Sequence, residues 1–182
     1  MSGYVFMVDA SSWILMHEER YCPDILPGLW THLRSFGEQG RIKTTREVLG
    51  EVRGDKEGVG AWLRTIQPTI VVPVTTAIGT RVGELVTAYP DLVEDYTTDA
   101  DPWLIAFAEH HDWVVVTEER PSSGPTPKIP NVCQDLDVTW IDCTEMIRRL
   151  AIRWESDDPE QSAARSKKQF PENMKKLFRQ KG

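Results

Sequence analysis

The chain has 182 residues, 40% of them hydrophobic, and a formal net charge of −7. These values are typical of one globular domain with its own core and exclude the need for a disulfide framework, since the three cysteines show no CxxC spacing. No stretch is long enough to span a bilayer, and the apolar run Tyr4–Val8 is too short for a signal peptide, so we expect a cytoplasmic protein without membrane contact.

Short apolar runs alternate with helical patterns along the chain. Tyr4–Val8, which is β-branched and aromatic and ends at Asp9, predicts a buried first strand. Further strands are predicted at Arg41–Lys43, Thr69–Val72, Trp113–Thr117 and Val138–Ile141. Helices are predicted at about Ser11–Met16, Ile25–Phe36, Thr45–Arg53, Val59–Ile66, Thr75–Ala88, Asp101–His111 and Thr144–Trp154. This alternation predicts an α/β fold whose parallel sheet is covered on both faces.

Capping residues mark several of these helix starts. Ser11 and Ser12 follow the first strand and can cap the first helix. Either Thr44 or Thr45 is placed to cap one later helix, and either Thr75 or Thr76 is placed to cap another. Pro102, at a first helical position, makes Asp101 the expected N-cap of the helix that follows.

The charge is distributed unevenly along the chain. Residues 155–160 are acidic and contain a proline, whereas residues 165–182 carry seven Lys or Arg against one Glu, a net +6 that leaves −13 for the rest. We therefore expect a folded domain over residues 1–154 and a charged linker and basic tail over 155–182. The tail is either frayed or a docking segment for a partner, another subunit or an RNA backbone. A body this acidic would not attract nucleic acid by its net field, so such a substrate would need local basic loops and metal ions.

Four acids lie at predicted strand ends and helix starts: Asp9, Glu51, Asp101 and Glu119. The carboxyl ends of parallel strands meet at one edge of a sheet, where open α/β folds place their sites. Carboxylates gathered there repel one another, so the pattern favours a site for a hard divalent cation, Mg²⁺ or Mn²⁺. Such ions support phosphodiester cleavage by activating water and by neutralising charge on the phosphate.

Each acid also has a purely structural interpretation. Asp9 could end a strand, Asp101 could serve only as a cap, and Glu51 and Glu119 could be solvated surface residues. Three neighbours compete for the same roles: Glu47, Asp99 and Glu118.

The order of these segments resembles the PIN domain, the nuclease fold of VapC-type toxins. The resemblance is carried by Val8-Asp9-Ala10-Ser11, by residues Thr45 to Gly54 with the motif Glu at Glu51, by Asp101-Pro102-Trp103-Leu104-Ile105-Ala106-Phe107-Ala108, and by Val115-Val116-Thr117-Glu118-Glu119. Pro27-Gly28-Leu29-Trp30 and Lys128-Ile129-Pro130-Asn131-Val132-Cys133 also look like one bacterial branch of these proteins. The chain departs from the family at Glu119, where Thr-x-Asp is usual, and at Pro102, which shifts the pattern of small residues.

The resemblance implies a PIN-like three-layer α/β/α sandwich with a parallel five-stranded sheet in the order 3-2-1-4-5. It implies a Mg²⁺- or Mn²⁺-dependent endoribonuclease in which the four acids hold the metal and Ser11 and Thr117 support them. It further implies the toxin of a type II toxin–antitoxin pair, with a DNA-binding antitoxin as partner, and homodimers are common in the family. The alternatives are an RNA-processing PIN nuclease outside such pairs and a catalytically silent PIN-like binding module.

Basic residues near the acidic edge could hold an RNA backbone locally. They are Arg20, Arg41, Lys43, Arg46, Arg53, Arg120 and Lys128. Their alternative is the ordinary one of solvated surface charges.

Overall fold

A parallel four-stranded sheet forms the centre of the computed structural model, which describes residues 3–52, 58–93 and 99–152. The strands are β1 (Phe6–Val8), β2 (Ile42–Lys43), β3 (Val114–Val116) and β4 (Trp140–Ile141), in the order β2-β1-β3-β4. Phe6 pairs with Ile42 on one side and with Val114 on the other, so β1 is central. The predicted linker and basic tail, residues 155–182, lie outside the described residues.

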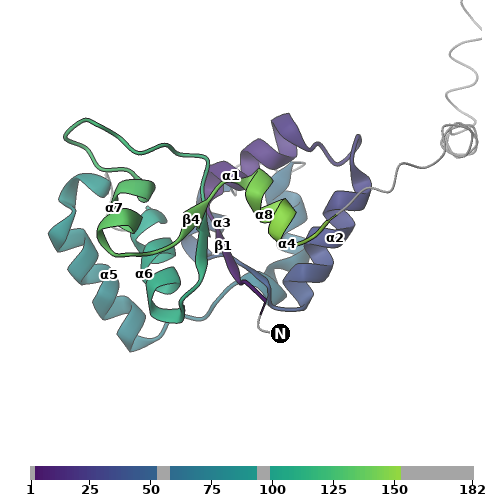
Figure 1. Cartoon of the computed structure of the whole chain (residues 1–182). Coiled ribbons are helices and arrows are strands. Elements are labelled where there is room, and N and C mark those ends of the chain that lie inside the picture. The colour runs from purple at the N-terminus through teal and green to yellow at the C-terminus, as the bar shows by residue number, and fades with distance from the viewer. Residues whose placement is uncertain (1–2, 53–57, 94–98, 153–182) are drawn as a thin grey trace, which may run out of the picture. The chain divides into compact units, whose positions relative to one another are not determined.

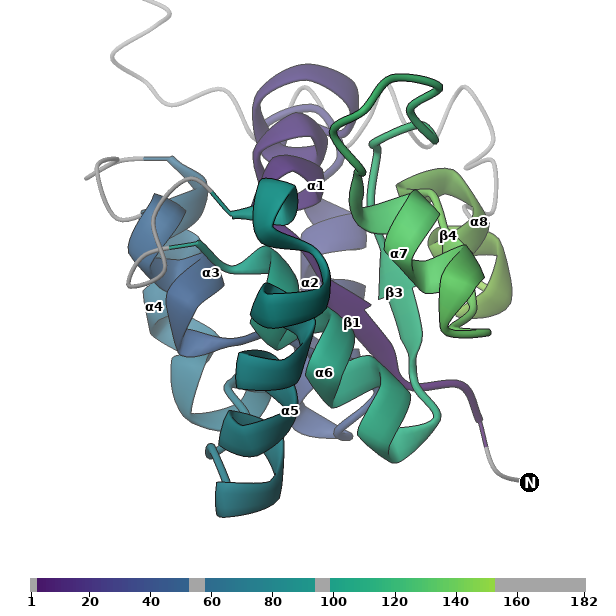
Figure 2. The same cartoon turned by 90° about the vertical axis from the view of Figure 1, so that its left-hand side faces the viewer.

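Helices cover both faces of this sheet. They are α1 (Ala10–Leu15), which continues as the π-helical turn η1 (Met16–Arg20), α2 (Pro27–Glu38), α3 (Arg46–Glu51), α4 (Val59–Ile70), α5 (Thr76–Ala88), the 3₁₀ turn η3 (Pro90–Leu92), α6 (Asp101–His111), α7 (Ile129–Asp135) and α8 (Cys143–Arg149). In Figure 1, α5, α6 and α7 lie on one side of the sheet and α2, α4 and α8 on the other, and Figure 2 looks onto the α5 and α6 side. The predicted three-layer α/β/α sandwich is confirmed. Within the described ranges, no helix has the length and apolar character that crossing a membrane requires.

The core is built around β1, β3 and α6. All residues of both strands are buried, and so are the five consecutive residues Leu104–Ala108. α6 packs on β1 and β3 with one side and on α5 and α7 with others, which explains why it is apolar on nearly every face. Since α6 is held from several directions, its first residue, Asp101, has a fixed position at the sheet edge.

One of the five predicted strands, Thr69–Val72, is reduced to a single parallel bridge between Thr44 and Val71. Thr44 N–H donates to the Ile70 carbonyl at 3.0 Å, and Val72 N–H donates to the Thr44 carbonyl at 3.3 Å. The bridge lies beside β2, where the order 3-2-1-4-5 places its third strand. α4 takes up the residues before Val71, and Pro73, which has no N–H, follows directly, so the ladder stays short.

The helix caps confirm two predictions and correct two. Of the two alternatives at each start, Thr45 and Thr75 are the caps, and they accept hydrogen bonds from Val48 N and Ile78 N. The first helix, however, is capped by Asp9 and not by Ser11 or Ser12. Ala100 occupies the N-cap position of α6, so the predicted cap, Asp101, is instead the first helical residue.

Candidate metal and nucleic-acid site

Asp9 follows β1 directly and is only 4% exposed. Its Oδ2 accepts hydrogen bonds from Thr117 Oγ1 at 2.7 Å and from Ser11 Oγ at 2.9 Å, and its Oδ1 accepts from Ser12 N at 2.6 Å. Burial raises the pKa of Asp9, and these donors act in the opposite direction. Ser11 and Thr117, the predicted supporting residues, therefore both contact the carboxylate and orient it.

Glu51 ends α3 and reaches across to the start of α6. Its Oε1 accepts a hydrogen bond from Ala100 N at 2.9 Å, which joins the N-cap of α6 to α3. Burial raises the pKa of Glu51, and the negative charges of Asp99 and Asp9 raise it further. The carboxylate thus lies within electrostatic range of Asp9, although the two residues are separated by a strand and two helices along the chain.

Asp101 lies at the electrostatic centre of the site. Its pKa is raised from the ordinary value of 3.8 to about 7, and burial is the largest cause. Four negative charges add to this effect; in decreasing order they are those of Glu119, Asp9, Glu51 and Asp99. The structure therefore brings the four predicted acids together at the carboxyl edge of the sheet.

Glu119 is held at the start of α7. Its Oε2 accepts a hydrogen bond from Ile129 N at 3.0 Å, and its Oε1 lies 3.5 Å from Lys128 Nζ. Its own N–H donates to Thr117 Oγ1 at 3.2 Å, so the hydroxyl that binds Asp9 also fixes the backbone of Glu119.

The three competing acids lie in different surroundings. Glu118 binds Arg20 at 2.7 Å and accepts a hydrogen bond from Cys143 N at 2.9 Å, so it is committed to α8 and η1. Glu47 has one buried oxygen, Oε2, without a hydrogen-bond partner. Asp99, in contrast, acts on both Glu51 and Asp101 and lies beside them.

A pocket of about 220 Å³ opens next to these acids. Its lining is dominated by carboxylates, with one lysine: Glu51, Asp91, Leu92, Asp99, Asp101, Thr126, Pro127 and Lys128. The donors are all oxygens, which is the ligand type that Mg²⁺ and Mn²⁺ prefer. Sequence reasoning missed Asp91, Thr126 and Pro127, since nothing local indicates that η3 and the loop before α7 close this pocket.

The carboxylate oxygens at this edge are of the ligand type that a hard cation binds. Several of them, however, already accept hydrogen bonds from the protein. Among the residues that the structure describes, no three His, Cys, Asp or Glu side chains are grouped so as to hold a metal ion. Oxygens of Asp9, Glu51 and Glu119 each accept a hydrogen bond from a backbone N–H group.

The predicted RNA-binding residues differ in their exposure and in whether another group of the protein already binds them. Arg20 is paired with Glu118, and Lys43 donates to the Thr69 carbonyl at 2.9 Å. Arg46 and Arg120 are exposed, and Arg53 lies outside the described residues. Of these residues, Arg20, Lys43, Arg46 and Arg120 do not line the acidic pocket, whereas Lys128 does.

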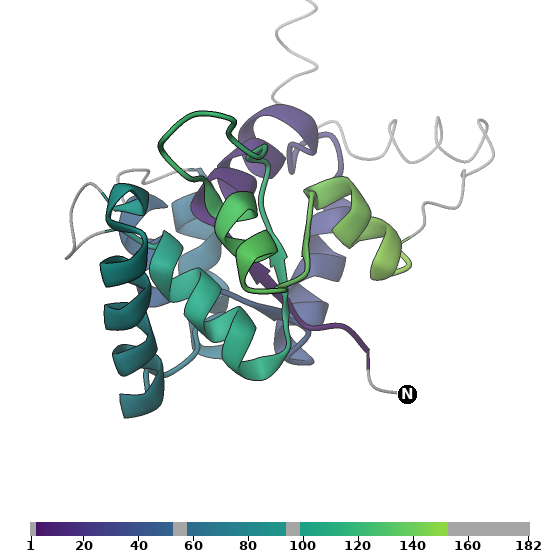
Figure 3. The ribbon, with the colours of Figure 1, turned by 60° about the vertical axis from the view of Figure 1, so that its left-hand side comes forward.

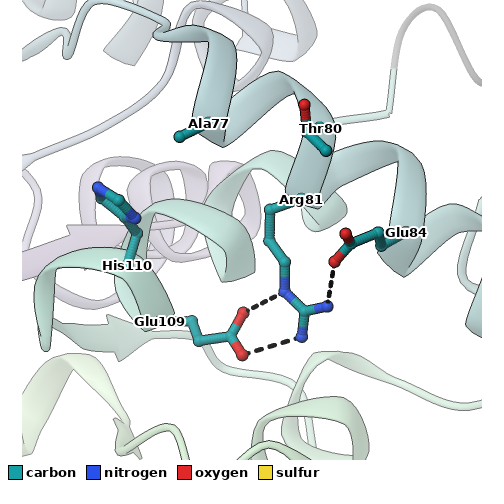
Figure 4. A pocket seen from close by; sticks show the side chains of 6 residues that line it. All are labelled: Ala77, Thr80, Arg81, Glu84, Glu109 and His110. Atoms are coloured by element: carbon teal, nitrogen blue, oxygen red, sulfur yellow. Dashed lines mark hydrogen bonds and ion pairs between the residues drawn. The ribbon is translucent and has the colours of Figure 1, made fainter.

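A second hollow, of about 500 Å³, lies between α5 and α6 (Figure 4). Arg81 there forms a bidentate pair with Glu109, at 2.6 and 2.9 Å, and bonds Glu84 at 2.8 Å. Because the guanidinium is already neutralised by two carboxylates, we interpret this cluster as a brace between the two helices.

Comparison with solved structures supports the fold. The chain is similar to the crystal structure of VapBC2 from Rickettsia felis bound to a DNA fragment from its promoter, with a TM-score of 0.50, 13% identity, and coverage of 76% of this chain and 98% of that chain. Two further similar structures are PAE2754 from Pyrobaculum aerophilum (TM-score 0.48, 15% identity, 82% and 97% coverage) and VapBC-1 from nontypeable Haemophilus influenzae (0.46, 14%, 77% and 98%). At these identities the likeness is one of fold, and the predicted PIN-like architecture is confirmed.

Two comparisons of sequence complete the assignment. No curated protein matches the chain. The profile of one family, described as "Domain of unknown function (DUF4411)", matches residues 6–154, which is most of the chain, and the chain therefore belongs to this family.

Proposed function

We propose that this chain is a Mg²⁺- or Mn²⁺-dependent endoribonuclease that hydrolyses RNA phosphodiester bonds, and that it is the toxin of a type II toxin–antitoxin pair. The observation that carries the proposal is the environment of Asp101. A buried carboxyl group with four negative neighbours has an unfavourable free energy unless a proton or a cation neutralises it. Acids from four separate segments of the chain create this environment, and a divalent cation bound among them would offset their mutual repulsion.

Asp9, Glu51, Asp101 and Glu119 would hold the cation. When bound, such a cation makes water more acidic and offsets the charge of the attacked phosphate. Thr117 and Ser11 orient Asp9 by donating to it, and the Ala100 and Ile129 N–H groups orient Glu51 and Glu119. In this proposal no protein side chain acts as the nucleophile.

The fold match to the VapBC2 structure, which includes promoter DNA, supports the toxin assignment and a DNA-binding antitoxin as partner. Expression of the wild-type chain in a bacterial host should then arrest growth, and Asp9→Asn should relieve the arrest. If deletion of the gene instead leaves a defined RNA precursor uncut, the chain is an RNA-processing nuclease outside such a pair.

One observation favours a second candidate, a catalytically silent PIN-like binding module. Glu119 stands where PIN domains usually have Asp. Both of its carboxylate oxygens have partners at the start of α7. A silent module would show neither Mn²⁺-dependent cleavage nor specific Mn²⁺ binding.

The deciding experiment is cleavage of total RNA with Mn²⁺ by the wild type and by two matched variants of α6. Asp101→Asn should lower the rate about 100-fold or more, because it removes a charged ligand. Asp112→Asn, at the exposed C-cap of the same helix, should leave the rate unchanged. Equal cutting by the wild type and Asp101→Asn would point to a contaminating nuclease and contradict the proposal.

A further inference from the structure

Lys128 projects from a backbone position that is fixed at the wall of the acidic pocket. Its N–H donates to Asn131 Oδ1 at 3.0 Å, and the same oxygen accepts from Ser122 N at 2.8 Å. Asn131 Nδ2 returns a hydrogen bond to the Ser122 carbonyl at 3.0 Å. Asn131 therefore ties the loop between β3 and α7 to the start of α7. The course of this loop can be followed in Figure 3.

The side chain of Lys128 is, in contrast, loosely held. Its ammonium group lies 3.5 Å from Glu119 Oε1, and the side chain is 51% exposed. A long ion pair in contact with solvent contributes little to stability, so the ammonium group can exchange its partner readily. Arg20, which contacts Glu118 at 2.7 Å, is held much more closely.

The charge balance of the pocket requires a positive group wherever a phosphate enters. Glu51, Asp91, Asp99 and Asp101 line it, and Lys128 is the one Lys or Arg among its described lining residues. A divalent cation would offset only two of these negative charges. A phosphodiester, which carries a negative charge of its own, would still meet surplus negative charge unless a cationic side chain contacts it.

We propose that Lys128 Nζ binds a non-bridging oxygen of the RNA phosphodiester at the mouth of this pocket, exchanging Glu119 for the phosphate as the substrate enters. The inference rests on the proposed ribonuclease function and makes Lys128 the residue that positions the reacting phosphate. Before cation and RNA are bound, Glu119 holds the ammonium group at the pocket.

The kinetic test compares three variants in Mn²⁺-dependent RNA cleavage. Lys128→Ala should raise KM about tenfold and change kcat much less, since a charge-assisted contact to the substrate is lost. Lys128→Arg should restore most of the affinity. The matched control is Arg148→Ala, which removes another exposed cation whose pair to a glutamate, Glu145, is also 3.5 Å long. It should leave KM unchanged.

A binding test separates failure of this inference from failure of the proposed function. The affinity for a short fluorescein-labelled single-stranded RNA is measured against salt in an Asp101→Asn background, where the RNA stays intact. Adding Lys128→Ala should reduce the slope of log K against log salt by about 0.7, the value for one phosphate contact. Mn²⁺ affinity, from calorimetry on the wild type and Lys128→Ala, should stay the same.

Unchanged KM and slope in Lys128→Ala would overturn the inference, as would altered Mn²⁺ affinity with an unchanged slope, which would make Lys128 only a counter-ion of Glu119. If the wild type cuts no RNA, the proposed function fails. The salt slope, measured on wild type and Lys128→Ala, would still decide whether Lys128 contacts phosphate.

Discussion

The carboxyl group of Asp101 is buried at the first residue of α6 with the charges of four other acids around it. Its pKa in the folded protein, about 7, lies above the ordinary value of 3.8, so the folded state binds this proton more tightly than the unfolded state. The free energy of unfolding that this group contributes is therefore present at low pH and is lost as the pH rises towards 7.

This sign gives a stability prediction for the metal-free protein. At pH 8 with a chelator, Asp101→Asn should be more stable than the wild type by about 2–4 kcal/mol, because it removes the buried charge. Near pH 4 the two proteins should be similar. Urea denaturation at both pH values measures the difference, and equal differences at pH 4 and pH 8 would contradict the assigned pKa.

Glu47 and Glu51 allow a second comparison of single residues. They lie one turn apart on α3, but only Glu51 lines the acidic pocket. Glu51→Gln should therefore weaken Mn²⁺ binding about tenfold or more, whereas Glu47→Gln should leave it unchanged. Calorimetric titration of the two variants with Mn²⁺ decides between them, and the reverse result would make Glu47 the ligand.

At the scale of elements, α2 and α4 approach each other closely at Gly37. A Cβ atom there would lie 2.8 Å from Ile70 Cγ2, which cannot swing away because it is attached to a branched Cβ. Gly28, on the same helix, has no heavy atom within 4 Å of a built Cβ. The close approach places α4 so that Ile70 and Val71 reach β2 and form the short bridge at the sheet edge.

Substitution of the two glycines tests this contact. Gly37→Ala should lower the free energy of unfolding by about 1–3 kcal/mol through overpacking against α4. Gly28→Ala should leave it unchanged or raise it slightly, because alanine favours a helix. Urea denaturation of both variants provides the measurement; equal effects would mean that α2 and α4 can separate without loss.

At the scale of the whole molecule, local sequence patterns predicted the strands and helices whose formation depends on neighbouring residues. The buried run before Asp9, the apolar α6 and the strand before Thr117 identified the layers and the edge where the acids meet. Long-range contacts were not predictable in this way. The hydrogen bond from Ala100 N to Glu51 and the one from Thr117 Oγ1 to Asp9 join segments that are distant in sequence. Likewise, the Thr69–Val72 pattern could not show that α4 would extend into it.

The boundary at residue 154 remains a prediction, and truncation tests it. A chain ending at Trp154 should unfold at the same urea concentration as the full chain, since Met1–Ile152 form a compact unit of their own. Its affinity for RNA should fall and depend less on salt, because residues 165–182 carry a net +6. A lower unfolding midpoint would show instead that the tail belongs to the folded domain.

The three cysteines differ in burial, which has a practical consequence. Cys133 and Cys143 are fully buried, and burial raises the pKa of Cys133 to about 12 and that of Cys143 further, so both remain protonated thiols at neutral pH. Cys22 is partly exposed. A maleimide dye should therefore react with the native protein at Cys22 alone and with all three sulfurs in urea, so the natural chain already carries a single attachment point for fluorescence studies of RNA binding.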